Sequence, residues 1–365
     1  MKSISTFITL VLALTLSNAA DPFHVYVPSR DTGELLIIEG IPTEDDGLTL
    51  ALVDEINLGF PATTIVAHPE KPLLYISTNN SESDPAPGAL VTLDPAGDYH
   101  SDDPLELKHG YAYLSLDRAN RFLLGANYRG GQIDVYSLKE NGALGPRVAA
   151  LDEGRPTAHC VLPSPDNSFV YIPYVKDQNA LYQYQFDPAS GNLTALDPLN
   201  ADPPEGTGPR HMAYHPTLPF VYFSNEQGIG VSVYEKLESG QLKFKQNVEV
   251  IPASERPEKG ASASDITITP DARFLFTGQR SGDETALPNA INRYRINDDG
   301  QVEHLGATPA DAIPWGLALS PDGHFLLVTA FKGGTLTAYE ITEDGDLIKA
   351  ASLPIPEKIS DLVTR

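Results

Sequence analysis

The stretch "AYHPTLPFVYF", residues 213–223, contains the pattern that decides the fold of this chain. Two short apolar runs flank a polar turn at Pro216. The pattern recurs in "VAHPEKPLLYI" (66–76), "SLDRANRFLLG" (115–125), "LPSPDNSFVYI" (162–172), "TITPDARFLFT" (267–277) and "ALSPDGHFLLV" (318–328). The turn positions Pro69, Arg118, Pro165, Pro216, Pro270 and Pro321 follow one another at intervals of 47 to 54 residues. A period of this length indicates a repeat protein.

A seventh copy is divided between the two ends of the chain. Tyr26 of "FHVYVPS" (23–29) stands 49 residues before Tyr75, so this copy has the second apolar run without the first. The C-terminal segment "KISDLVTR" (358–365) resembles "SASDITIT" (262–269), which is the first run of the copy around Pro270. We therefore expect the C-terminal segment to supply the missing strand and to close the chain into a ring.

Each copy has the pattern of four β-strands. A third, alternating run follows the first two, as in "QIDVYSL" (132–138) and "LTAYEI" (336–341), and a turn with glycine leads to a fourth. The turn glycines are Gly47, Gly97, Gly142, Gly191, Gly240, Gly300 and Gly345. Seven such units predict an all-β, seven-bladed β-propeller with four antiparallel strands per blade. Because no linker interrupts the period, residues 21–365 are expected to form one domain, and a closed ring with few free edges is expected to be monomeric.

Residues 1–20 do not belong to the repeat. Lys2 precedes an apolar run from Phe7 to Leu16, and the small residues "SNAA" follow before Asp21. This order is typical of a secretory signal peptide, and the run is too short to span a membrane. We expect export to the periplasm or the extracellular space, with no membrane association after cleavage.

The composition excludes several classes of partner and site. A net charge of −24 disfavours nucleic acids and anionic membranes as partners. The single cysteine, Cys160, cannot form an intramolecular disulfide and is interpreted as a buried apolar residue. The nine histidines show no metal-binding spacing, and the chain lacks a nucleophile elbow, a P-loop and a dinucleotide fingerprint. The sequence therefore predicts neither a metal nor a cofactor.

Equivalent positions of the repeat point to a site. Six residues before each turn the innermost strand begins, and ten residues after it the neighbouring strand ends, so both positions lie at one end of a hairpin beside the central channel. The earlier position holds Thr63, Ala112, His159, Arg210, Ser264 and Trp315, and the later one holds Asn79, Tyr128, Val175, Glu226, Arg280 and Phe331. Two arginines, a glutamate and a histidine at one rim are unfavourable unless they pair or bind a ligand. They form either a structural salt-bridge cluster or a site for an anionic or carbonyl-bearing ligand.

Three segments carry a resemblance to a known family. "EGTGPRHMAYHPTLPFVYFSNE" (205–226), "AHCVLPSPDNSFVYIPYVKDQ" (158–178) and "ASASDITITPDARFLFTGQR" (261–280) resemble the lactonase-type seven-bladed propellers. That group includes the bacterial 6-phosphogluconolactonases and is similar to the fungal carboxymuconate cyclases. The resemblance covers the whole chain after the signal peptide and is sharpest over residues 150–280.

The resemblance implies which residues form the site. It places the catalytic residues at His159, Arg210, Glu226 and Arg280, and it adds Lys176, Asp177 and His211 as substrate contacts. Where family members often carry "PRG", this chain has Ile313-Pro314-Trp315-Gly316, and residues 281–289 form an insertion beside the site. Trp315 is expected either to stack on a sugar or to pack between blades, and Asn79 is a further candidate contact.

The expected activity is hydrolysis of a sugar-acid lactone, of the 6-phosphogluconolactonase type, without a metal. Arg210 and Arg280 would stabilise the tetrahedral oxyanion, Glu226 would deprotonate water, and His159 would protonate the leaving alkoxide. Two alternatives stay open. One is a cycloisomerase or lyase acting on a muconate-like dicarboxylate, and the other is an exported propeller that binds a ligand without turnover.

The signal-peptide interpretation predicts the mass of the exported protein. Cleavage after Ala19 or Ala20 should give a chain that begins at Ala20 or Asp21. Intact-mass spectrometry of the protein from the exported fraction measures this directly. A mass that includes Met1 would contradict the interpretation.

Overall fold

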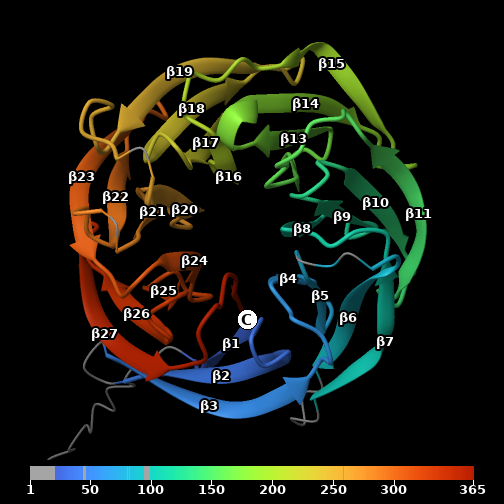
Figure 1. Cartoon of the computed structure of the whole chain (residues 1–365), viewed down its shortest axis with the longest axis horizontal. Coiled ribbons are helices and arrows are strands. Elements are labelled where there is room, and N and C mark those ends of the chain that lie inside the picture. The colour runs from blue at the N-terminus through green and yellow to red at the C-terminus, as the bar shows by residue number, and fades with distance from the viewer. Residues whose placement is uncertain are drawn as a thin grey trace, which may run out of the picture.

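The computed structural model describes residues 21–43, 47–79, 81, 83–93, 99–257, 259–283 and 285–365. The expected signal peptide, residues 1–20, and the turn glycine Gly97 lie outside these ranges. The described residues form seven four-stranded antiparallel sheets arranged around a central axis, as Figure 1 shows. The predicted seven-bladed β-propeller is therefore confirmed.

The seven blades follow one another in chain order, except that the first borrows a strand from the C-terminus. Its strands are β28 (Val363–Thr364), β1 (Phe23–Pro28), β2 (Glu34–Pro42) and β3 (Leu48–Asn57). The second and third blades contain β4 (Thr64–Ala67), β5 (Leu73–Ser77), β6 (Ala86–Leu93), β7 (Tyr99–Leu107), β8 (Tyr113–Leu116), β9 (Phe122–Ala126), β10 (Ile133–Leu138) and β11 (Leu144–Leu151).

The other four blades keep the same order from the channel outward. The fourth and fifth contain β12 (Leu162–Pro163), β13 (Phe169–Tyr174), β14 (Ala180–Phe186), β15 (Leu193–Asn200), β16 (Pro209–Tyr214), β17 (Phe220–Asn225), β18 (Gly230–Lys236) and β19 (Leu242–Glu249). The sixth and seventh contain β20 (Ala261–Ile268), β21 (Phe274–Ser281), β22 (Ala290–Ile296), β23 (Val302–Pro309), β24 (Pro314–Leu319), β25 (Phe325–Ala330), β26 (Thr335–Ile341) and β27 (Leu347–Pro354).

The ring closes where the C-terminal segment pairs with β1, as expected. Val363 and Thr364 lie opposite Tyr26 and Val25, and the backbones of Arg365 and His24 exchange hydrogen bonds of 2.8 and 2.9 Å. The strand is shorter than the segment that was expected to form it. Packing supports the closure, because Ile359 and Leu362 are buried in the apolar cluster between the last blade and the first.

Neighbouring blades are joined by a contact that repeats around the ring. The turn between the third and fourth strands of one blade docks onto the second strand of the preceding blade. Gly240 has φ +84°, and a Cβ there would lie 2.0 Å from the Phe169 ring, so only glycine fits. The Tyr171 hydroxyl donates to the Gly240 carbonyl at 2.6 Å. Tyr75 and Gly142, and Tyr222 and Gly300, repeat this bond at 2.7 and 2.9 Å.

The first strand of the fourth blade differs from its expected form. A regular strand was predicted around "AHCVLP", but β12 contains only Leu162 and Pro163, and Ala158 forms an isolated bridge to Tyr174. The interruption lies at His159–Val161, where the backbone leaves the regular ladder. It coincides with one of the candidate catalytic residues.

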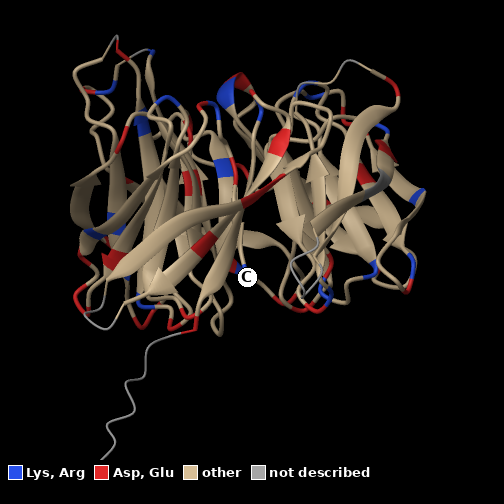
Figure 2. Ribbon diagram, turned by 90° about the horizontal axis from the view of Figure 1, so that it is seen from below, with Lys and Arg blue, Asp and Glu red and all other residues tan. Residues whose placement is uncertain are grey.

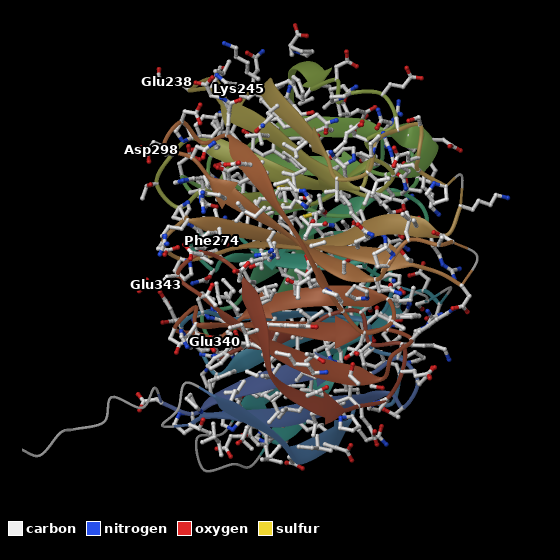
Figure 3. The ribbon with its side chains drawn as sticks, turned by 90° about the vertical axis from the view of Figure 1, so that its left-hand side faces the viewer. Glu238, Lys245, Phe274, Asp298, Glu340 and Glu343 are labelled. Carbon is white, nitrogen blue, oxygen red and sulfur yellow. The ribbon has the colours of Figure 1, made fainter. Side chains whose placement is uncertain are left out.

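Acidic side chains are spread over both faces of the ring rather than gathered in one patch (Figure 2). Glu238, Asp298 and Glu343 belong to turns between third and fourth strands and lie along one edge of the molecule in Figure 3. These turns are at the opposite ends of the strands from the candidate site. Within the described ranges, no helix is both long and apolar enough to span a membrane.

Closure by packing predicts a large effect of truncating Leu362, which is 4% exposed. Leu362→Ala should lower the free energy of unfolding by about 2–5 kcal/mol, because it leaves a cavity between the last and first blades. The matched control is Ile348→Ala on β27, where the side chain is 54% exposed and the change should stay within about 0.5 kcal/mol. Urea unfolding measures both, and equal effects would show that the closing segment does not stabilise the ring.

Candidate active site

A cavity of about 410 Å³ opens at one end of the central channel, within the range of small-molecule sites. Its wall comes from the starts of innermost strands and the ends of their neighbours, in six blades and the C-terminal segment. The lining residues are Thr63, Thr64, Asn79, Ala112, Tyr128, Arg129, His159, Lys176, Arg210, His211, Glu226, Ser262, Arg280, Trp315, Ser360 and Asp361. The repeat therefore brings residues that are distant in sequence into one pocket.

The centre of the cavity wall is an ion-pair triad. The Glu226 carboxylate accepts from Arg210 Nε at 3.1 Å and from Arg280 Nη2 at 3.4 Å, both through Oε2. All three side chains are at most 10% exposed. Burial alone would raise the pKa of Glu226, but the two guanidinium groups outweigh it and hold the pKa below its usual range. The triad keeps one surplus positive charge.

The arginines have more donors than Glu226 can accept. Arg280 Nη2 also donates to the Ala263 carbonyl at 2.6 Å. Arg210 Nη1 and Arg280 Nε are buried and have no hydrogen-bond partner among the described residues. Arg256 Nε and Arg293 Nε, in ion pairs outside the cavity, are also buried without a partner in the described part of the chain, so the unpaired donors alone do not distinguish this site from an internal salt bridge.

A second chain of polar contacts leads away from the triad. His159 Nε2 lies 3.9 Å from Glu226 Oε2, and its Nδ1 lies 3.1 Å from His211 Nε2. His211 Nδ1 lies 2.7 Å from Asp265 Oδ1. Burial, with Arg210 as the next cause, lowers the pKa of His211 to about 4 and holds the pKa of His159 well below its usual range. Both imidazoles are therefore neutral near pH 7.

Two aspartates near the cavity differ in charge: Asp361 lines it, whereas Asp265 contacts the lining residue His211 and is not itself part of the wall. Asp265 is ionised, because the contact with His211 overcomes burial and lowers its pKa. Burial and the neighbouring Asp265 raise the pKa of Asp361 to about 8. The Asp361 carboxyl accepts from the backbone N–H groups of Ile65 and Leu362, at 3.0 and 2.9 Å.

Aromatic rings border the cavity on two sides. The Trp315 ring lies 4.3 Å from the Arg280 guanidinium carbon and 4.6 Å from the Phe331 ring centroid. Lys176 Nζ lies 5.4 Å from the centre of the Tyr128 ring, which in turn meets His159 edge-on at 5.3 Å. Trp315 thus packs on Phe331 of its own blade and covers Arg280 of the neighbouring sixth blade.

The structure gathers eight of the nine candidate residues around the cavity. The exception is Asp177, which is exposed in a short 3₁₀ turn and does not line the cavity. Ser264, at the same repeat position as Arg210, does not line the cavity, and its hydroxyl donates to the Pro314 carbonyl at 2.8 Å. Asp265 was missed, although "SASD" and "KISD" share an aspartate at one repeat position. Cys160 is buried, as expected.

Within the described part of the chain, no three His, Cys, Asp or Glu side chains are grouped so that they could hold a metal ion. His159, His211 and Asp265 are instead arranged in line, each bonded to the next. The arrangement suits proton transfer and charge stabilisation. It combines a buried cationic group, two neutral imidazoles and an ionised carboxylate within one pocket.

Comparison with known proteins identifies relatives of this architecture. A family model described as "Lactonase, 7-bladed beta-propeller" matches residues 25–360. The chain is 29% identical over 304 residues to a 6-phosphogluconolactonase of Enterobacter sp. (strain 638), which covers 80% of this chain and 85% of the relative. Among solved structures, a periplasmic gluconolactonase of Pseudomonas aeruginosa superposes with a TM-score of 0.80 at 21% identity, covering 94% of this chain and 99% of that one.

The neutral buried histidines predict a loss of stability in mild acid. A histidine whose pKa is lowered in the folded protein binds a proton more readily in the unfolded chain. Its contribution to the free energy of unfolding is therefore complete above pH 6.5 and decreases as the pH falls. From pH 6.5 to pH 5 the free energy of unfolding should decrease in both proteins. In His211→Gln the decrease should be about 1–2 kcal/mol smaller than in the original protein.

Urea unfolding at pH 6.5 and 5 tests this difference between the two proteins. Asp361, with its raised pKa, acts in the opposite direction, since its contribution decreases as pH rises. It is present in both proteins and largely cancels in the comparison. Equal losses in the two proteins would contradict a neutral, buried His211.

Proposed function

The chain belongs to the lactonase family of seven-bladed β-propellers, and on that basis we propose that it hydrolyses a sugar-acid lactone through His159, Arg210, Glu226 and Arg280. The observation that carries the proposal is the buried Arg210–Glu226–Arg280 triad with a neutral imidazole 3.9 Å from its carboxylate. Lactone opening requires a site for negative charge beside a group that can move a proton. This cavity offers both.

Arg210 and Arg280 stabilise the oxyanion that forms when water attacks the lactone carbonyl. Fixed cationic donors in a site with little water act strongly on developing charge and need no reorganisation during the reaction. Glu226 holds the two guanidinium groups against each other's repulsion and leaves them a net positive charge. Its role in this proposal is to position and balance the arginines.

The proton is moved by His159. From sequence, Glu226 was expected to be the base and His159 the acid. The Glu226 carboxylate already accepts from both arginines through Oε2, whereas His159 is neutral and its Nε2 lies 3.9 Å from that oxygen. His159 Nε2 therefore accepts the proton of the attacking water and returns it to the ring oxygen as the ester bond breaks.

The cavity supports a single sugar ring as substrate. Its volume of about 410 Å³ and the flat face of Trp315 suit a polyhydroxylated ring, and Lys176 supplies a cation near the mouth for an acidic substituent. The names of the relatives, 6-phosphogluconolactonase and periplasmic gluconolactonase, favour an aldonolactone with or without a phosphate. The reaction as proposed needs no metal, and Asn79 and His211 complete the polar wall.

We place this reaction outside the cytoplasm. The pattern of residues 1–20 and the periplasmic relative both support export of the enzyme. We propose a monomer because the closed ring leaves few free strand edges. An unphosphorylated sugar lactone fits such a compartment, because sugar phosphates are mainly intracellular. The phosphorylated and unphosphorylated lactones are therefore the central comparison in any assay.

Proton release from a panel of lactones tests the proposal. Purified protein should open gluconolactone, its 6-phosphate or galactonolactone faster than the spontaneous reaction. His159→Gln and Arg210→Ala should each lower kcat by about 10²–10⁴-fold, because they remove the base and an oxyanion donor. His324→Gln, an exposed change outside the cavity, is the matched control and should keep full activity. A folded protein with no turnover on these lactones, but with lactone formed from a muconate, would replace hydrolysis by cycloisomerisation.

A further inference from the structure

We propose that Asp265 and His211 form a positioning pair that fixes the proton of His159 on Nδ1, so that Nε2 of His159 faces the substrate as the base. The inference rests on the proposed lactone hydrolysis for its catalytic meaning. Its structural content, the tautomer of His159, stands separately and can be measured without any substrate.

The pair begins at a carboxylate that is fixed from two sides. Asp265 Oδ1 accepts from the backbone N–H of Ile266 at 2.9 Å, and Oδ2 accepts from the N–H of Leu317 in the next blade at 3.0 Å. An ionised carboxylate can only accept hydrogen bonds. At 2.7 Å from Asp265 Oδ1, His211 Nδ1 must therefore be the donor and carry the hydrogen.

The hydrogen bond between His211 and His159 has a fixed direction for the same reason. A neutral imidazole carries one hydrogen, so His211 Nε2 has a lone pair and accepts from His159 Nδ1 at 3.1 Å. His159, also neutral, is then left with an unprotonated Nε2. That atom points toward the ion-pair triad, 3.9 Å from Glu226 Oε2. The base thus has its lone pair where an attacking water would be held.

A structural role alone does not explain the arrangement. Asp361 is the counterpart of Asp265 in the repeat and makes the same two backbone contacts, to the following residue and to the next blade. Both aspartates link two neighbouring innermost strands through backbone hydrogen bonds, but of the two only Asp265 contacts an imidazole. Asp361 links its strands without a histidine, so this linking does not require His211. His211 adds a connection between Asp265 and His159 that extends over three successive blades.

The pair has a defined part in the reaction. As the water oxygen bonds to the carbonyl carbon, one water proton moves to His159 Nε2 and the ring becomes an imidazolium. Its Nδ1–H still donates to His211, whose own Nδ1–H donates to Asp265, so the new positive charge is stabilised through neutral His211 by the carboxylate. The proton on Nε2 then moves to the ring oxygen as the carbon–oxygen bond breaks. No further reactant is required.

The first test is the tautomer of His159 in the substrate-free protein. Long-range ¹H–¹⁵N spectra, assigned by comparison with His159→Gln, distinguish a protonated Nδ1 from a protonated Nε2. We expect the Nδ1–H form in the original protein. In Asp265→Leu, His211 Nδ1 loses its acceptor, so the proton of His159 is no longer fixed on Nδ1 and the Nδ1–H form of His159 should lose population. The matched control, Asp361→Leu, should keep the Nδ1–H form of His159.

Kinetics supply the second test. Asp265→Leu should lower kcat with little change in KM, by at most the about 10²–10⁴-fold that a general base contributes, because the lactone site remains but the proton of the base is no longer fixed on Nδ1. His211→Gln can donate to Asp265 and accept from His159 and should keep most of the activity, whereas His211→Leu should not. An Nε2–H tautomer in the original protein would overturn the proposal, as would equal activity in the two His211 variants. An Nδ1–H tautomer without turnover of any lactone would instead reject the proposed function and leave the positioning pair standing.

Discussion

Closure of the ring is the constraint on which the rest of the structure depends. Each blade buries its two faces only against its neighbours, so the first and last blades must meet before the set is complete. That connection is made by the two residues of β28 and by two backbone hydrogen bonds at Arg365. The buried side chains of Ile359 and Leu362 support it. The same segment lines the cavity with Ser360 and Asp361. The site and the closure of the fold thus share one short piece of chain.

One repeat position near the candidate site holds a different side chain in each copy, and these side chains make different contacts. The residue five before each turn is Thr64, Tyr113, Cys160, His211, Asp265 or Gly316 in the six full copies, and Asp361 has the same place in the divided copy. Tyr113 packs edge-on against His211, and Cys160 fills apolar space. His211 and Asp265, in successive blades, are bonded to each other, and so are Tyr113 and Cys160. Unlike side chains at equivalent positions thus produce a polar connection that no single blade contains.

Much of this architecture follows from the sequence. The period, the turn glycines and the divided seventh copy predict the blades and their closure, because strand alternation and turn chemistry are local properties. The same register places Arg210, Glu226 and Arg280 at one rim. The placement of Asp177 depends instead on a 3₁₀ turn, and that of Ser264 on a hydrogen bond to the Pro314 carbonyl of the next blade, and the spacing of the repeat indicates neither. The proton position on His159 depends on contacts between three blades, and a pattern within one blade does not contain it.

The pairing of β28 with β1 also bears on how the molecule is made. A chain that emerges with its N-terminus first presents β1 long before its partner strand exists, so the first sheet stays incomplete while six others form. The contact that finishes the ring joins residues separated by almost the entire described chain, and contacts of such separation form slowly. Closure of the ring is therefore expected to be the last step of folding, after the other six sheets have formed.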